Sequence, residues 1–165
     1  MNRYGHNKDR TNMQTYREEI LKDSWDDRNL GIPYNPTRAE YHLNFEKIDT
    51  VYKNLIKKYL QQRLFVQDSI KFSTARSELH TLVPFVKFIV FKYPKWTDLK
   101  NLNRNDIEEY LEQLKSTPMK GNRDSSFKER KPTNYNVWRM IGGLENFLYY
   151  IQRYEWPEAP DLPIR

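Results

Sequence analysis

The 165-residue chain contains no cysteine, which excludes disulfides, a thiol nucleophile and a cysteine-based zinc site. Its five glycines are dispersed, and neither phosphate-loop pattern, G-x-x-x-x-G-K or G-x-G-x-x-G, occurs. The histidines His6, His42 and His80 lack paired ligand spacing, so we expect no metal and no cofactor. An apolar run of about 18 residues is also missing, as is the apolar core of a signal peptide. We therefore expect no membrane association and a cytoplasmic location.

Paired acidic groups of the kind used in catalysis are missing as well. Asp26-Asp27 and Glu108-Glu109 are adjacent in sequence, and neighbouring residues on a helix point about 100° apart. Nothing in the sequence assembles a nucleophile, a base and an orienting group. We predict no catalytic residues, and the chain as it stands is not expected to be an enzyme.

What the chain does contain is positive charge and aromatic residues. The net charge is +6, the isoelectric point is near 9.4 and the mean hydropathy is −0.96. Hydrophobic residues make up only 38% of the chain, but 15% are aromatic and can each bury a large area. A basic balance is typical of proteins that bind DNA, RNA or acidic membranes, although basic charge also keeps domains soluble.

Hydrophobic periodicity predicts an all-α fold without strands. Residues 1–44 are polar and broken by Gly31, Pro33 and Pro36, so we interpret them as a partly irregular N-terminal extension with a short helix over 15–25. Four amphipathic helices should follow, over about 46–67, 72–93, 104–116 and 133–155. Asn103 and Asp106 predict a cap for the third of these. Residues 118–131 are expected to form a charged loop, and 157–165, with a proline every third residue, an extended linker.

Two of these helices begin alike, and their beginnings are our candidate binding site. Each starts with hydroxyl, amide and basic side chains and then turns apolar, which suits contact with an anionic backbone. The alternative is that Ser73 and Thr133 are ordinary N-caps and that the cations form a solvated surface. The candidate DNA-binding residues are Lys71, Ser73, Thr74, Arg76, Ser77 and His80 in the first, and Lys128, Arg130, Lys131, Thr133, Asn134, Asn136 and Arg139 in the second.

Other features of the two helices have structural explanations. Pro84 should bend its helix, and the Gly142-Gly143 pair indicates a close helix contact or a bend. The aromatic residues of these helices fit a core better than a platform for stacking bases. They are Phe85, Phe88, Phe91, Trp96, Trp138, Phe147, Tyr149, Tyr150 and Tyr154.

The order of these motifs resembles the core-binding domain of tyrosine recombinases of the phage-integrase type. The resemblance rests on a helix opening Phe72-Ser-Thr-x-Arg76, a short acidic helix from Asp106, a basic loop and a helix opening Pro132-Thr-Asn-Tyr-Asn136. The run from Asn35 to Tyr41 looks most like mobile-element transposases of this mechanism. The resemblance implies a SAM-like four-helix bundle, with residues 45–156 as the DNA-binding domain, 1–44 as its extension and 157–165 as the start of an interdomain linker.

In that family the domain is one jaw of a clamp around a recombination site, with two helices against the major groove. The resemblance therefore implies double-stranded DNA as the partner, with other recombinase protomers when the protein is full length. It also implies a bacterial, nucleoid-associated location. The family's catalytic domain carries a His-x-x-Arg box and a nucleophilic Tyr. Here Asp9, Phe45 and Val83 stand three residues after the histidines. We therefore expect the binding part of a longer recombinase.

Two other functions stay open from the sequence alone. A helical protein-interaction module would use an exposed aromatic face, and its binding would depend little on salt. Single-stranded nucleic-acid binding by stacking would require Trp138 or Phe85 to be exposed to solvent.

Overall fold

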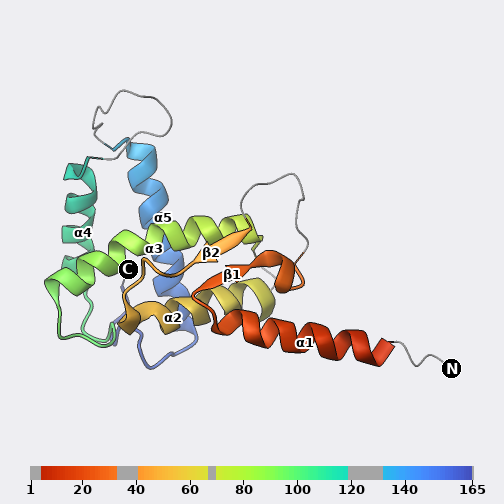
Figure 1. Cartoon of the computed structure of the whole chain (residues 1–165). Helices are drawn as coiled ribbons and strands as arrows, with labels where there is room; N and C mark the ends of the chain where they lie inside the picture. Colours follow the sequence, from red (N-terminus) through yellow and green to blue (C-terminus); the bar gives the residue numbers. More distant parts are fainter. Residues whose placement is uncertain (1–4, 33–40, 67–69, 119–131, 165) are drawn as a thin grey trace. The chain divides into compact units, whose positions relative to one another are not determined.

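The computed structural model describes residues 5–32, 41–66, 70–118 and 132–164. They form two compact units, Met1–Leu79 and His80–Arg165, each of which is considered by itself. Figure 1 shows the elements in chain order: α1 (Gly5–Leu21), β1 (Ser24–Asp26), the 3-10 turn η1 (Asp27–Asn29), β2 (His42–Asn44), α2 (Thr50–Gln61), the π-helical turn η2 (Gln62–Val66), α3 (Phe72–Lys92), α4 (Arg104–Ser116) and α5 (Asn134–Arg153).

The predominantly helical class is as predicted, but the described residues also hold two short strands. Both strands fall inside the segment 1–44. The helix expected over 15–25 is instead α1, which ends at Leu21 and leaves Trp25 in strand β1. The prediction that the chain has no strands is wrong. The SAM-like bundle and the domain boundary at residue 45 stay predictions.

The first unit has a core that includes residues expected to lie in an extension. Strands β1 and β2 pair antiparallel with Trp25 opposite Leu43, and neither side chain has any solvent exposure. The Trp25 ring packs against Phe45, with ring centroids 4.7 Å apart. The N-terminal residues therefore contribute to the hydrophobic core.

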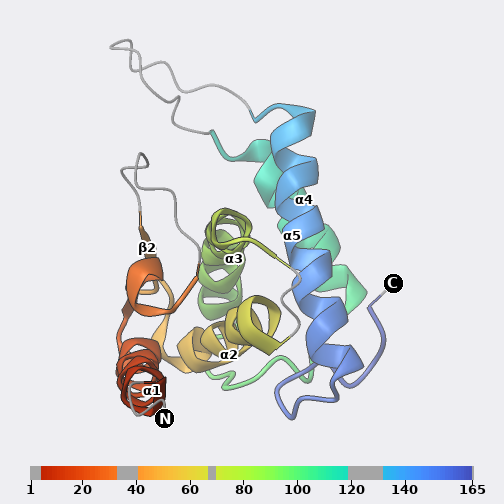
Figure 2. The same cartoon turned by 90° about the vertical axis from the view of Figure 1, so that its right-hand side faces the viewer.

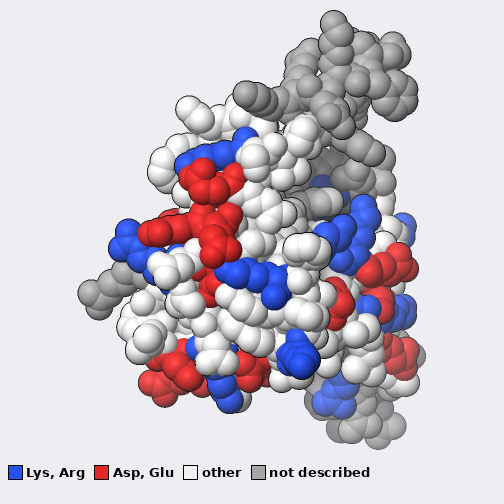
Figure 3. All heavy atoms as spheres, turned by 90° about the vertical axis from the view of Figure 1, so that its left-hand side faces the viewer, with Lys and Arg blue, Asp and Glu red and all other residues white. Residues whose placement is uncertain are grey.

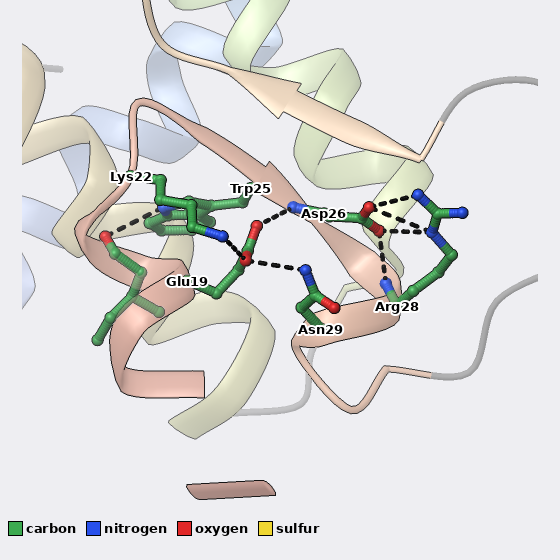
Figure 4. A network of polar contacts seen from close by, with 7 residues as sticks. Glu19, Lys22, Trp25, Asp26, Arg28 and Asn29 are labelled. Carbon is green, nitrogen blue, oxygen red and sulfur yellow. Dashed lines mark hydrogen bonds and ion pairs between the residues drawn. The ribbon is translucent and has the colours of Figure 1, made fainter. Parts of the chain in front are cut away.

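A buried carboxylate joins α1 to this small sheet (Figure 4). Glu19 accepts hydrogen bonds from the backbone N–H of Asp26 (2.7 Å), the Asn29 amide (2.9 Å) and Lys22 (2.7 Å). Burial alone would raise the pKa of Glu19, but these hydrogen bonds outweigh it and the pKa lies below its ordinary value. The Trp25 indole N–H donates to the carbonyl of Ile20 (3.1 Å), which fixes the end of the helix.

Helix α2 is shorter than the predicted 46–67. It begins at Thr50 because the Asp49 carboxylate accepts a hydrogen bond from Val51 N (3.0 Å), and its α-helical part ends at Gln61. The π-helical turn follows and carries Arg63 into the interior. There Arg63 donates to Glu78 (2.6 Å) and to the Tyr59 hydroxyl (2.9 Å), which itself donates to Glu78 (2.9 Å). This buried network ties α2 and η2 to the first turns of α3.

In the second unit the predicted third helix has the expected bounds. The Asn103 side chain accepts from Asp106 N, and Asp106 accepts from Asn103 N, so the predicted cap is confirmed as a capping box. Lys92 and Tyr93, at the end of α3, both bind the buried Asp106 carboxylate, at 2.8 and 2.6 Å. Helices α4 and α5 lie side by side and run in opposite directions (Figures 1 and 2).

The glycine pair of α5 has two different environments. A Cβ on Gly143 would lie 2.1 Å from Thr81 Oγ1, so the expected close helix contact is confirmed at this position. A Cβ on Gly142 would meet nothing within 4 Å. Only Gly143 is required by packing.

The residues after α5 pack against the second unit. Ala159 is buried, and backbone hydrogen bonds join Leu99 N to Glu158 O (2.9 Å) and Asp161 N to Lys100 O (3.0 Å). Gln152 donates to the carbonyls of Pro160 and Leu162. The described part of 157–165 is therefore held in place by α5 and by the loop before α4, unlike the free extended segment we predicted.

Candidate nucleic-acid interface

The first candidate site is the beginning of α3. The helix starts at Phe72, and the carbonyl of Lys71 accepts from Thr74 N (2.9 Å) and Ala75 N (3.0 Å). Lys71 thus occupies the N-cap position, and the suggestion that Ser73 is an ordinary N-cap is wrong. The Ser73 side chain lies within the first turn, beside the buried Phe72.

The candidate side chains of α3 share one side of the helix. Helical spacing separates them from the buried residues Ala75, Leu79 and Leu82. Ser73, Arg76, Ser77 and His80 fall on one face, and Thr74 lies at its edge. Lys71, Thr74 and His80 are exposed, whereas Ser73, Arg76 and Ser77 are half-buried. All of them lie outside the core, as a binding role requires.

The second candidate site is the beginning of α5. Thr133 is its N-cap, and the Thr133 hydroxyl accepts from Asn136 N (3.3 Å). The capping alternative therefore holds for Thr133, whose hydroxyl serves the helix. Asn134 and Arg139 are exposed, and Arg139 forms no ion pair with any described residue. The first turn contains no acidic side chain, which favours an anionic ligand.

Sequence reasoning missed Lys87 of α3. This exposed lysine lines a recess of about 570 Å³ together with Pro84, Asn136 and Met140. Asn136 is half-buried and lines the same recess as Lys87, a proximity that the sequence analysis did not predict. Lys87 follows His80 by seven residues, so helical spacing was the signal that could have identified it.

The basic residues Lys128, Arg130 and Lys131 lie outside the described residues, and their role stays a prediction. The aromatic residues that we expected in the core divide into three groups. Phe85, Phe88 and Phe147 are buried as expected, and Trp96 and Tyr150 are half-buried. Phe91 (90% exposed), Trp138 (73%), Tyr149 (53%) and Tyr154 (38%) are exposed, so the prediction that they belong to the core is wrong for these four.

Helix α4 carries the opposite charge. Figure 3 shows acidic side chains gathered over α4, where Glu108, Glu109 and Glu112 are exposed. The neighbouring cations are already engaged: Lys92 with Asp106 and Glu109, and Lys115 with Glu112. An anionic polymer would be repelled from this helix, so α4 is an unsuitable surface for it.

Among the described residues, no group of three or more histidine, cysteine or acidic side chains is placed to hold a metal ion. None of the helices in the described ranges is long and apolar enough to cross a membrane.

Similarity to known proteins points to mobile elements. The chain is 33% identical over 147 residues to transposase B of transposon Tn554 from Staphylococcus aureus strains Mu50 and N315. Its identity to transposase B of transposon PsiTn554, also from S. aureus, is 33% over the same length. These matches cover 87% of the chain but only 21% of each relative, so the chain spans about a fifth of their length. No protein-family model and no solved structure matches.

Proposed function

We propose that this chain is a DNA-binding part of a transposase-related protein. The observation that carries the proposal is the beginning of α5, where Asn134 and Arg139 are exposed in a stretch without acidic residues. The similarity to transposase B over most of the chain supports it, because a transposase acts on DNA. The net charge of +6 has the sign that such a partner requires.

More specifically, we propose that the chain is the core-site clamp domain of a tyrosine recombinase. The beginning of α3 then contacts duplex phosphates through Lys71 and Arg76, and the beginning of α5 does so through Arg139. Lys87, further along α3, adds a cation beside the recess that Asn136 lines. Strand cleavage would depend on a separate catalytic domain, since the sequence contains no His-x-x-Arg box. Other copies of the full-length protein would assemble on the same DNA.

The proposal is tested by removing one cation from each helix. Because each phosphate contact releases counterions, Arg76→Ala and Arg139→Ala should each lower the slope of log affinity against log salt by about 1. Together they should weaken binding to a mixed-sequence duplex at least about tenfold. Fluorescence anisotropy at several salt concentrations measures both quantities.

Lys115→Ala is the matched control, because it removes one positive charge from the acidic helix α4. It should leave affinity and salt slope unchanged. If the double variant binds as tightly as the wild type, the assignment of these helices is wrong. If Lys115→Ala weakens binding equally, the attraction reflects net charge rather than a site.

A further inference from the structure

Helix α5 displays large aromatic side chains to solvent. Tyr135 is 75% exposed, Trp138 73% and Tyr149 53%, while Val137 and Met140 between them are buried. Spacings of three and eleven residues place all three aromatics along one side of the helix. Tryptophan and tyrosine dominate the energetics of binding surfaces, so their exposure here calls for a ligand rather than a packing explanation.

The charges around these residues differ along the helix. Tyr135 and Trp138 lie among Asn134 and Arg139, and no acidic residue occurs between Pro132 and Leu144. Tyr149 follows Glu145 by one turn, and its hydroxyl accepts a hydrogen bond from Arg153. Arg153 is thus engaged within the helix, whereas Arg139 has no ion pair among the described residues. The charge therefore favours an anionic ligand at Tyr135 and Trp138 only.

One turn after Trp138, the same face of the helix carries Gly142. Any side chain at that position would lean back toward residue 138. The space above Gly142 is open, since a Cβ there would meet nothing within 4 Å. The exposed indole thus has room beside it for a flat ligand.

We propose that Tyr135 and Trp138 form the apolar part of a duplex DNA contact, packing on deoxyribose and base edges while Arg139 holds a phosphate. This inference rests on the proposed function. DNA combines anionic groups with apolar base surfaces such as the thymine methyl, which matches a surface that combines Arg139 with two aromatic rings.

An apolar protein segment is the competing occupant. A groove of about 850 Å³ between α4 and α5 is lined by Ile107, Leu111, Trp138 and Tyr149. Tyr135 does not line this groove. A segment bound there would require Trp138 and Tyr149 together, whereas the DNA contact requires Trp138 and Tyr135. Two acidic and two basic residues also line the groove, so their charges balance and the groove offers DNA no net attraction; they are Glu108, Glu145, Arg104 and Arg153.

The experiment compares Tyr135→Ala, Trp138→Ala and Tyr149→Ala in the full chain, on a mixed-sequence duplex at low salt. The first two should each weaken binding about tenfold, within the range of a lost aromatic contact. The salt slope should stay at its wild-type value, because no phosphate contact is removed. Trp138→Phe should restore most of the affinity, and Tyr149→Ala should bind like the wild type.

Three results would overturn the inference. If Tyr135→Ala and Trp138→Ala both bind with wild-type affinity, these two residues do not contact DNA. If Trp138→Ala and Tyr149→Ala lose the same affinity, the ligand binds in the groove instead. If the variants lose affinity for one strand of this sequence, tested alone, but not for the duplex, the aromatic residues stack on single-stranded bases. Failure of the proposed function is distinguishable, because then the wild type itself does not bind or Arg139→Ala leaves the salt slope unchanged.

Discussion

At the scale of single residues, Asp106 links the end of α3 to the beginning of α4. Its carboxylate is almost fully buried. Burial alone would raise the pKa of Asp106, but hydrogen bonds from Lys92, Tyr93 and the Asn103 backbone outweigh burial and hold the pKa below its ordinary value. The ionised form therefore stabilises the fold. Its contribution is present above the pKa of an unfolded aspartate and is lost as the pH falls through the lower, folded value.

Asp106→Asn should consequently lower the free energy of unfolding at neutral pH by about 1.5–3 kcal/mol, the range for hydrogen bonds to a charged group. The difference from the wild type should shrink in acid. Urea unfolding at a series of pH values measures it, with the exposed Glu108→Gln on the same helix as the control. A difference that stays constant down to low pH would show that the charge of Asp106 contributes nothing.

Single residues also show what the sequence could not determine about the site. The residue types at the beginnings of α3 and α5 were identified correctly as surface groups, because amphipathic spacing separates them from the core. Whether a hydroxyl caps the helix depends on where the first turn starts, and α3 starts two residues too early for Ser73 to be its cap. Trp138 adjoins the buried Val137, so spacing alone placed it in the core, although its side chain is exposed.

At the scale of elements, local signals determined how well each boundary was predicted. Helix α4 matches because the Asn103–Asp106 capping box and Thr117-Pro118 mark both ends within a few residues. Helix α2 begins later than predicted, because Phe45 and Ile48 continue the helical spacing although the Asp49 cap excludes them. The three-residue strands offer too few positions for alternation to be recognised. Their pairing depends on contacts distant in sequence.

The glycine pair of α5 gives an element-scale prediction. Gly142→Ala should stabilise the chain by about 1 kcal/mol, since alanine favours the helix and the space is open. Gly143→Ala should destabilise it by about 1–3 kcal/mol, because its Cβ would overlap Thr81. Thermal unfolding followed by circular dichroism compares the two. Adding Thr81→Ala removes Oγ1 and Cγ2 but keeps a Cβ at 2.9 Å, so it should relieve part of the overlap in Gly143→Ala. Equal melting temperatures for both glycine variants would contradict the close contact.

At the scale of the whole chain, the main error of sequence reasoning concerns residues 1–44. Their polar composition and prolines resemble those of a loose extension, and α1 has few apolar residues. The segment is nevertheless anchored by a small number of fully buried groups, above all Trp25, Leu43 and the Glu19 carboxylate. Composition averages over a segment and does not reveal that one tryptophan in it is completely buried.

Trp25→Ala therefore tests whether this segment contributes to the stability of the protein. Removing a fully buried tryptophan should lower the free energy of unfolding by about 3–5 kcal/mol, whereas a residue in a loose extension would have almost no effect. Leu21→Ala is the matched control in the same segment, because Leu21 ends α1 with 80% of its surface exposed and should change stability by less than about 0.5 kcal/mol. Denaturant unfolding of the wild type, Trp25→Ala and Leu21→Ala measures these differences in the free energy of unfolding. If Trp25→Ala unfolds like Leu21→Ala, the N-terminal residues are an accessory to the fold rather than part of its core.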